Sequence, residues 1–539
     1  MVRGRPPGSG PSMEGCVSGP IYDATTMWEL VDRRAAATPD GLMLVDEAGR
    51  QLTFGQFRDR AERVAAGLYA LGVGEATPVT WQLPTRIESI LVSMALARLG
   101  ALQNPIIHIY REREVGFALR QTGSRFVLTP GRWKGFDFGA MARSLAAELD
   151  PAPMVLDAFE DLPEGDPATL PAPADGADDP VRWIYYTSGT TSEPKGVRHT
   201  DKTLLAGGRG LAIALDMAPS DVGSIAFPFA HIAGPDYLVT VLASGFPAVL
   251  VESFVPTDAV EFYRRNGVTM AGGSTAFYQA FLAEQRKAPG QKLIPTLRLL
   301  SGGGAAKPPE IYYEVQREIG VKVAHGYGMT EIPMIAQGSP HDSDDQLVGS
   351  EGKPVFGAEV RIVTADGDVA PAGVDGEVRV KGPMVCKGYT DPELTAAAFD
   401  EDGFFRTGDV GHMRPDGHLT LTGRLKDVII RKGENISAKE VEDLLYSHPS
   451  VGDVAVIGLP DRERGERVCA VVETAAGAAP LRFDDMVGHL RSAGLMVQKI
   501  PEQLEVVDAL PRNETLRKVL KYKLREEYAA KPWTPAASC

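Results

Sequence analysis

Cysteines are scarce in this chain of 539 residues, which contains only Cys16, Cys386, Cys469 and Cys539. The four lie far apart in the sequence, so they match neither the ligand spacing of a zinc site nor the dense pattern of a disulfide-stabilised secreted domain. This scarcity argues against a cysteine-based metal site and predicts a protein of the reducing cytoplasm.

No stretch of the sequence is apolar for long enough to cross a membrane. The longest apolar region, residues 87–109, is interrupted by Glu88 and Arg98, and we expect it to form a buried helix and strand. A secretory signal is not visible either, because Arg3 and Arg5 are followed by proline, glycine and serine instead of an apolar segment. We therefore expect a cytoplasmic protein without a membrane span.

A surplus of basic residues is also missing. The chain has 56 Lys and Arg against 71 Asp and Glu, a formal net charge of -15. Such a balance argues against a general nucleic-acid surface and leaves local basic sites to bind any phosphate groups. With 44% hydrophobic and 24% charged residues, the composition is that of an ordinary globular protein.

Helical and strand patterns alternate along most of the chain. Thr25 or Thr26 can begin a helix that runs toward Arg34, and apolar residues then recur at helical spacing until Gly72. Such alternation is typical of an α/β fold with mostly parallel sheets. The short apolar runs expected to form strands are residues 43–45, 181–186, 248–251, 297–300 and 321–324.

The length exceeds what one hydrophobic core usually supports, so we expect more than one domain. Residues 1–20, rich in glycine, proline and serine, predict a disordered tail. Residues 21–423 predict a large N-terminal domain of several subdomains. Residues 424–539 predict a small α+β domain, because short strands at 428–430, 454–459 and 469–473 flank a helix at 438–447.

Residues 186–196 combine hydroxyls, glycines and one lysine directly after an apolar run. Backbone N–H groups of such a loop can approach an anion, its hydroxyls can donate to phosphate oxygens, and Lys195 adds a positive charge. It is not the common nucleotide P-loop, because Pro194 precedes the lysine where that pattern needs glycine. An ordinary strand-to-helix turn is the alternative. The expected phosphate-binding residues are Thr187, Ser188, Gly189, Thr190, Thr191 and Lys195.

Three later clusters repeat the combination of glycine, hydroxyl and charged side chain. Residues 326–331 read Gly-Tyr-Gly-Met-Thr-Glu, residues 403–409 read Gly-Phe-Phe-Arg-Thr-Gly-Asp, and residues 422–427 read Thr-Gly-Arg-Leu-Lys-Asp. In order and wording, the four motifs resemble the adenylate-forming superfamily of acyl-CoA synthetases, luciferases and peptide-synthetase adenylation domains. The resemblance extends from about Trp28 to Arg525.

The resemblance implies a site for ATP and Mg²⁺. The loop 187–195 would hold the β- and γ-phosphates, Thr330 would hydrogen-bond the α-phosphate, and Glu331 would be a Mg²⁺ ligand. Asp409 would grip the ribose hydroxyls, and Arg424 would reach the sugar or its phosphate. Taken singly, Glu331 and Asp409 are more typical of solvated surface carboxylates, and it is their motifs that favour the binding roles.

Small residues at 302–305 follow an apolar run and predict a crevice at the carboxyl end of a strand. The resemblance places adenine between this turn and Tyr327, whereas a tight structural turn is the alternative. The residues it assigns to nucleotide binding here are Gly303, Gly304, Ala305, Gly326, Tyr327 and Gly328.

His231 lies in an apolar segment that resembles the family's aromatic stretch beside the acyl carboxylate. We expect it to line the pocket and not to act as a base, and a buried core histidine is the alternative. Residues 226–234 contain no carboxylate, although amino-acid-activating relatives place an aspartate in this region, so the segment disfavours amino-acid substrates. A largely apolar pocket would favour a fatty or cyclic acid. Its expected lining includes Ile232, Tyr237, Phe277, Tyr327, Met329 and Ile332.

The last family motif is imperfect in this chain. Relatives carry Pro-Arg, three variable residues, Gly and Lys, whereas residues 511–518 contain one additional residue and no glycine. Alignment by the residues that follow favours Lys518 as the adenylation lysine, with Arg517 and then Lys521 as alternatives. Residues 517–525 could instead form a solvated basic helix.

Relatives rotate the small domain between adenylation and thioester formation, so the resemblance implies a mobile C-terminal domain. Lys426 stands at the expected hinge. In the second arrangement Lys432 and Gly433 would line the pantetheine channel of CoA, where glycine permits close approach of the thiol.

These observations favour an ATP-dependent acid:CoA ligase that acts on a small-molecule carboxylic acid through an acyl-AMP intermediate. One alternative is an adenylating enzyme that loads a carrier protein or releases acyl-AMP. Another is a nucleotide-binding protein in which the altered lysine loop has abolished catalysis. We expect a monomer or a homodimer, and no nucleic-acid partner.

Overall fold

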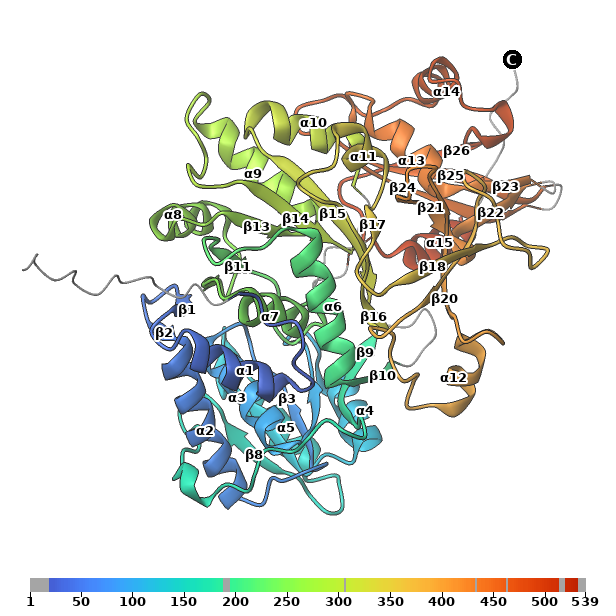
Figure 1. Ribbon diagram of the computed structural model, residues 1–539. Coiled ribbons are helices and arrows are strands. Elements are labelled where there is room, and N and C mark those ends of the chain that lie inside the picture. Colours follow the sequence, from blue (N-terminus) through green and yellow to red (C-terminus); the bar gives the residue numbers. More distant parts are fainter. Residues whose placement is uncertain are drawn as a thin grey trace, which may run out of the picture.

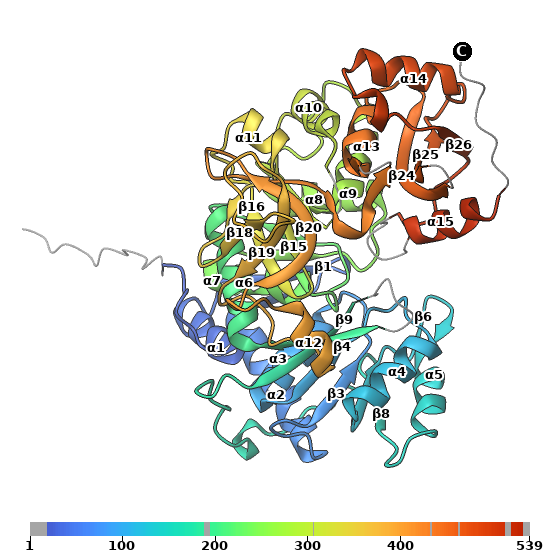
Figure 2. The same cartoon turned by 90° about the vertical axis from the view of Figure 1, so that its right-hand side faces the viewer.

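The computed structural model describes residues 19–187, 194–304, 307–431, 434–461, 464–512 and 519–531, and for Lys426, Glu434 and Asn435 the backbone alone. In Figure 1 the first residues, in blue, form the lower left of the molecule, and the last residues, in red, form a lobe at the upper right. The side view in Figure 2 shows the same lobe above the N-terminal part.

The first sheet has the strand order β10-β9-β4-β3-β5-β8. Its strands run parallel except β10 (Lys195–Thr200), which pairs antiparallel with β9 (Val181–Thr187). Residues 187 and 195 therefore belong to two strands of a hairpin, and the alternative of a strand-to-helix turn is wrong. The remaining strands are β3 (Pro78–Trp81), β4 (Leu102–Pro105), β5 (Phe126–Thr129) and β8 (Met154–Asp157).

Helices of the N-terminal part begin and end where local signals predict. The first helix starts after Thr26, whose hydroxyl accepts a hydrogen bond from the Glu29 N–H, and the second stops before Gly72, which has a φ of 98°. The region 87–109 forms a helix and a strand that are buried as expected. These helices are α1 (Met27–Ala37), α2 (Phe54–Ala70), α3 (Ile87–Leu99), α4 (Glu112–Thr122) and α5 (Phe138–Ala146).

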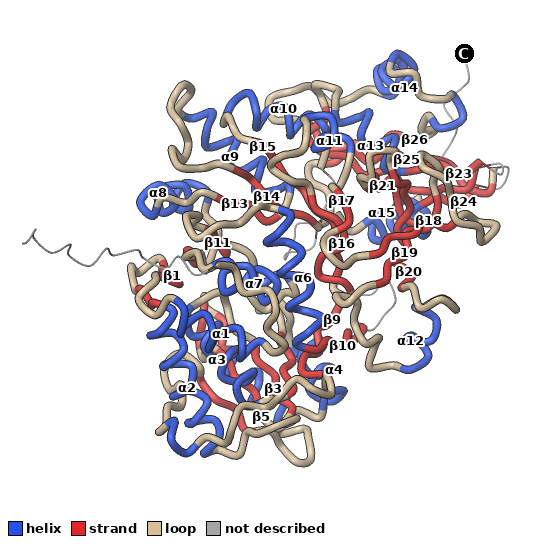
Figure 3. The backbone as a smooth tube through the Cα atoms, viewed as in Figure 1, coloured by secondary structure: helices blue, strands red, loops and turns tan. Residues whose placement is uncertain are grey.

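Two further sheets complete the α/β architecture, and Figure 3 shows how helices alternate with their strands. One has the order β11-β12-β1-β2 and the other β13-β14-β15-β16-β17. Their strands are β1 (Leu42–Asp46), β2 (Gln51–Thr53), β11 (Gly223–Ile225), β12 (Ala248–Leu250), β13 (Met270–Gly273), β14 (Leu299–Gly303), β15 (Lys322–Met329), β16 (Ile332–Gln337) and β17 (Lys353–Pro354). The helices are α6 (Asp201–Ala214), α7 (Ala233–Ser244), α8 (Pro256–Asn266), α9 (Thr275–Lys287), α10 (Pro309–Glu318) and α11 (Asp344–Gly349).

A fourth sheet is antiparallel throughout, which the expectation of mostly parallel sheets did not include. It has the order β18-β19-β20-β21, and α12 (Pro392–Ala398) lies between its second and third strands in the sequence. Residues 414–418 connect β20 to β21 as a short turn, which antiparallel strands permit and a parallel crossover does not. The strands are β18 (Glu359–Val363), β19 (Gly376–Lys381), β20 (Phe405–Met413) and β21 (Leu419–Arg424).

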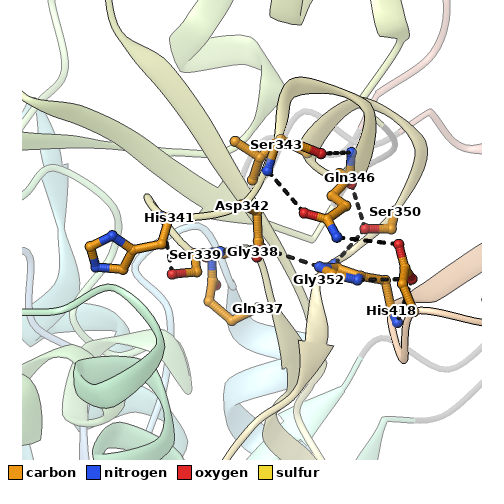
Figure 4. A network of polar contacts seen from close by, with 12 residues as sticks. Gln337, Gly338, Ser339, His341, Asp342, Ser343, Gln346, Ser350, Gly352 and His418 are labelled. Atoms are coloured by element: carbon orange, nitrogen blue, oxygen red, sulfur yellow. Dashed lines mark hydrogen bonds and ion pairs between the residues drawn. The ribbon is translucent and has the colours of Figure 1, made fainter.

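A polar network, shown in Figure 4, joins the third sheet to the fourth. Asp342, in the segment after β16, accepts a hydrogen bond from the Ser339 N–H and lies 3.4 Å from Nε2 of the fully buried His418. His418 Nδ1 contacts Asp416, which also accepts a hydrogen bond from Gln346 in α11. The network fixes the β20–β21 hairpin against the hairpin formed by β15 and β16.

The C-terminal part forms a separate α+β unit, as expected. Its two hydrophobic clusters contain only residues from Ile429 onward. The sheet has the order β23-β22-β25-β24, with β26 parallel to β25. Its elements are β22 (Val428–Arg431), β23 (Glu434–Ser437), β24 (Val451–Asp461), β25 (Gly465–Thr474), β26 (Gln503–Val507), α13 (Ala438–Tyr446), α14 (Phe483–Ser492) and α15 (Lys521–Ala529). Within the described ranges, no helix has the length and apolar character that a membrane crossing requires.

Candidate active site

A cavity of about 1550 Å³ lies between the carboxyl ends of β14 and β15, the β20–β21 hairpin and the C-terminal unit. Residues predicted from four separate motifs face this one space, which is where an α/β sheet typically binds ligands. The predicted residues that line it are Thr187, Lys195, His231, Ile232, Tyr237, Gly303, Gly304, Gly326, Gly328, Met329, Thr330, Glu331, Asp409 and Arg424.

Part of the cavity wall is bare backbone because glycines of two parallel strands lie side by side. Gly303 of β14 pairs with Gly326 of β15, and a Cβ atom at position 303 would lie 2.5 Å from the Gly326 carbonyl oxygen. Side chains cannot be accommodated there without moving a strand. The glycines therefore leave a flat surface against which a planar ligand can lie.

Glu331 is held in the turn between β15 and β16. Its side chain is 6% exposed, and Oε1 accepts a hydrogen bond of 2.8 Å from the Tyr389 hydroxyl. Its carbonyl oxygen accepts a hydrogen bond from the Cys386 N–H. Burial raises the pKa of Glu331, while the Tyr389 hydrogen bond and the charge of Lys195 oppose that increase.

Lys195 supplies a positive charge beside this carboxylate. It is the first residue of β10, pairs across the hairpin with Thr187, and its ammonium lies 5.5 Å from the centre of the Tyr389 ring. Such a cation–π contact holds a lysine in place without neutralising it. Lys195 and Glu331 thus present opposite charges to the same cavity, as a bound polyphosphate with its metal ion requires.

His199 was not predicted, yet it fixes the position of Thr330. The buried imidazole contacts the Thr330 carbonyl oxygen through Nε2 at 2.7 Å and the Thr203 hydroxyl through Nδ1 at 2.8 Å. Because a carbonyl only accepts, Nε2 carries the proton. Burial lowers the pKa of His199 to about 4, so the ring is neutral near pH 7. A histidine two residues before the start of α6 gives no sequence signal for this role.

Asp409 and Arg424 lie opposite each other on β20 and β21. Arg424 Nε is 2.9 Å from Asp409 Oδ1, and the Tyr327 hydroxyl donates a hydrogen bond of 2.5 Å to Oδ2. Asp409 is 6% exposed, whereas about half of the Arg424 side chain is exposed. The pair therefore offers a fixed carboxylate and a freer guanidinium to a ligand with hydroxyl and phosphate groups.

Comparison with known proteins shows which proteins combine these motifs. The family model described as AMP-binding enzyme matches residues 31–390, and the model described as AMP-binding enzyme C-terminal domain matches residues 440–516. The chain belongs to the AMP-binding enzyme family. Its relatives include AMP-forming acid–CoA ligases of the adenylate-forming superfamily, as the motifs indicated.

Curated relatives of the AMP-binding family cover nearly the whole chain. The medium-chain fatty-acid–CoA ligase of Escherichia coli is 30% identical, over 94% of this chain and 91% of the relative. The 2-succinylbenzoate–CoA ligase of Geobacillus kaustophilus is 36% identical, over 93% of this chain and 98% of the relative. Among solved structures, ATP-bound MatB from Rhodopseudomonas palustris superimposes with a TM-score of 0.83 at 28% sequence identity, over 93% of this chain and 99% of that protein. The structure of MenE from Bacillus subtilis with ATP and magnesium ion has a TM-score of 0.80 and 30% sequence identity, over 92% of this chain and 98% of that protein.

Two predicted residues lie beside the cavity without lining it. Ile332 is fully buried and packs with Val197 and Ile335 in the core between the third and fourth sheets, so its assignment to the acyl pocket is wrong. Tyr327 is 7% exposed and acts through its hydrogen bond to Asp409. Both residues face inward because they alternate along their strands with Gly326, Gly328 and Pro333, which line the cavity.

The start of the lysine loop, which we define as residues 511–518, lies at the cavity. Arg512 lines it and forms an ion pair with Asp453, and the backbone of Arg512 pairs with Val519 across residues 513–518. Lys521, the third alternative for the adenylation lysine, pairs with Glu442 at 2.7 Å and does not line the cavity. Helix α15 is only partly solvated, since its Leu524 and Tyr528 are buried.

Several predicted residues fall outside what the structure describes. Arg431, which precedes the expected CoA-channel residues, pairs with Glu502 and does not line the cavity. Of the described residues next to these two segments, Arg512 therefore lines the cavity and Arg431 does not. The predicted residues outside the described ranges are Ser188, Gly189, Thr190, Thr191, Ala305, Lys432, Gly433 and Lys518, and the side chain of Lys426.

The inner end of the cavity is formed by α6, α7 and β16. His231 accepts a hydrogen bond from the Ala233 N–H through Nδ1, consistent with a lining role and not with a free base. Most of the surrounding side chains are apolar, as expected. Asp236 is the exception, since this buried carboxyl also lines the cavity and lies two residues beyond the segment that the sequence showed to be free of carboxylates.

Proposed function

We propose that this protein is an ATP-dependent carboxylic acid:CoA ligase that acts on a fatty, alicyclic or aromatic acid. The observation that carries the proposal is the convergence of Lys195, Thr330, Glu331, Asp409 and Arg424 on one cavity. In the first step the acid carboxylate attacks the α-phosphorus of ATP, and pyrophosphate leaves. In the second step the thiolate of CoA attacks the acyl carbon of acyl-AMP, and AMP leaves.

The roles of the residues follow from their charge and position. Lys195 and residues 187–191 bind the β- and γ-phosphates, and Thr330 orients the α-phosphate for in-line attack. Asp409 accepts hydrogen bonds from the ribose hydroxyls, and Arg424, already paired with it, reaches the same sugar or its phosphate. Lys518 bridges the carboxylate and α-phosphate oxygens as charge develops between them.

Mg²⁺ enters this site with ATP. In the part of the chain that is described, no three His, Cys, Asp or Glu side chains are grouped to hold a metal ion by themselves. Glu331 provides one carboxylate, and the remaining ligands would be phosphate oxygens and water, a combination that suits Mg²⁺. The buried Tyr389–Glu331 pair orients that carboxylate toward the cavity.

The second step requires a different set of groups around the same carbonyl. We propose that the C-terminal domain, residues 424–539, rotates about Lys426 and replaces the lysine loop with Lys432 and Gly433 along the CoA channel. An ion pair of 2.6 Å between Arg525 and Asp427, next to the hinge, would have to accommodate this rotation.

Pyrophosphate release tests the proposal. The purified enzyme is assayed with ATP and Mg²⁺ across matched fatty, alicyclic and aromatic acids, with and without CoA. We expect release with at least one hydrophobic acid, and acyl-CoA only when CoA is present. No release with any acid, combined with normal ATP binding, would favour a nucleotide-binding protein that has lost catalysis.

A carrier protein is the alternative acyl acceptor. The chain is 30% identical to the salicyl-AMP ligase / salicyl-S-ArCP synthetase of Mycobacterium tuberculosis, over 91% of this chain. Pyrophosphate release that CoA leaves unchanged, with acyl-AMP accumulating, would support that alternative. Mass spectrometry of the products distinguishes acyl-CoA from acyl-AMP.

A further inference from the structure

Asp236 is a buried carboxyl without a partner. It lies in the first turn of α7, is 2% exposed, and its Oδ1 is fully buried without a hydrogen bond. Other buried aspartates of the same domain are paired, such as Asp201 with Arg182 and Asp221 with Arg298. Buried polar groups normally have hydrogen-bond partners. Because Asp236 lines the cavity and has none in the protein, its partner is expected to be a group of the ligand.

Space for this carboxyl is provided by α6. A Cβ atom on Gly207 would lie 2.5 Å from Asp236 Oδ1 and 2.9 Å from Cβ of Pro333, which also lines the cavity. Any larger residue at position 207 would displace the carboxyl or fill the space next to it. The carboxyl is thus situated between α6 and β16, at the inner wall of the cavity.

The neighbouring groups are apolar or uncharged. Leu211, Leu215 and Met334 also line the cavity, and no cation among the described residues stabilises the charge of Asp236. Burial therefore raises the pKa of Asp236 to about 8. At neutral pH the group is a protonated acid, which has an O–H to donate. The hydroxyl of Tyr185, close enough to interact electrostatically with Asp236, is also buried without a partner.

We propose that Asp236 is a specificity-determining residue that donates a hydrogen bond to a neutral oxygen, a keto or hydroxyl group, on the body of the acyl substrate. The proposal rests on the proposed function and specifies its substrate class as an oxygenated hydrophobic acid. A plain hydrocarbon chain would leave Asp236 unpaired in the complex, and a site with an unpaired polar group discriminates against such a ligand.

Matched acids that differ by one keto or hydroxyl group test this assignment. For wild type, kcat/KM for pyrophosphate release should be higher with an oxygenated acid than with its hydrocarbon counterpart by at least about tenfold. Asp236→Leu should reduce that ratio by about tenfold or more, because it removes the donor. Asp236→Asn keeps an N–H donor of similar size and should retain most of the ratio.

Control and pH measurements separate specificity from folding. Thr240→Val, on the same helix, removes a buried hydroxyl that donates to the Tyr237 carbonyl and does not line the cavity, so the ratio should not change. If Asp236→Leu fails to fold, the pH dependence of KM in the wild type and in Asp236→Asn still tests the assignment. The KM of the wild type for the oxygenated acid should rise above about pH 8, as the donor ionises, and that of the Asn variant should not.

Three results would overturn the assignment. Equal effects of Asp236→Leu on both members of every acid pair would show that the residue does not contact the substrate. A preference for an amine-bearing acid that Asp236→Asn abolishes would show recognition of a cation instead. Absence of pyrophosphate release with all acids would refute the proposed function and this inference together, whereas release without discrimination at Asp236 refutes the inference alone.

Discussion

Tyr389→Phe removes the hydroxyl that donates to Glu331 while leaving the ring under Lys195. The hydrogen bond spans 2.8 Å and joins two residues that are buried except where they line the cavity. A hydrogen bond to a charged group contributes about 1.5–3 kcal/mol. That free energy favours ionised Glu331, and its loss corresponds to a decrease of roughly 10- to 150-fold in the apparent affinity for Mg²⁺.

The direction of the pH dependence follows from the same contact. The Tyr389 hydrogen bond lowers the pKa of Glu331 against the effect of burial, so its removal raises that pKa further. Protonated Glu331 cannot bind Mg²⁺, and the acid limb of activity should therefore move to higher pH in the variant. Pyrophosphate exchange, measured from pH 5.5 to 9 at several Mg²⁺ concentrations, gives both the position of the acid limb of activity and the apparent affinity for Mg²⁺.

A matched variant controls for the loss of any tyrosine hydroxyl. Tyr312 donates a 2.7 Å hydrogen bond to Asp344 away from the cavity, so Tyr312→Phe should alter neither the Mg²⁺ dependence nor the pH limb. If Tyr389→Phe behaves like Tyr312→Phe, Glu331 is not the metal ligand and the reasoning is refuted.

Three further changes test other parts of the site. Burial lowers the pKa of His199 from 6.5 to about 4, so as the pH falls below 6.5 the unfolded chain binds a proton that the folded chain does not. The free energy of unfolding should therefore decrease by at most about 3 kcal/mol between these pH values. Chemical denaturation at several pH values should show that His199→Gln flattens this dependence. Asp409→Asn removes the charge that pairs with Arg424 and should raise KM for ATP by roughly tenfold or more with little change in KM for the acid, and the opposite pattern would contradict a ribose-binding role. Lys518→Ala should lower pyrophosphate exchange on the order of 100-fold or more while preformed acyl-AMP is still converted by CoA, whereas equal loss of both half-reactions would reject alternation between domains.

Motif residues were predictable because their chemistry is local. Thr330 and Glu331 occupy a turn, and Asp409 and Arg424 face each other on paired strands, so glycine, hydroxyl and charge occur there in a recognisable order. The residues that hold them were not predictable. His199 reaches Thr330 across 131 positions and Tyr389 reaches Glu331 across 58, and no local pattern indicates a contact at such separation.

The acyl end of the cavity shows the same limit. Sequence reasoning placed Ile332 among the apolar residues of the pocket, but strand alternation turns its side chain into the core. The same reasoning overlooked Asp236, because a single carboxyl in an apolar helix gives no sign of whether it is paired. Only the packing of α6 against α7 shows that it is not.

By itself, the sequence determined the family, the α/β class and the groups that we propose bind the nucleotide, since these depend on short ordered motifs and on periodicity. The tertiary structure decided which of those groups share a cavity, which buried partners orient them and where the acyl end contains a carboxyl. Those properties depend on contacts between segments far apart in the chain, and the free energy of such contacts is set by burial and distance in space.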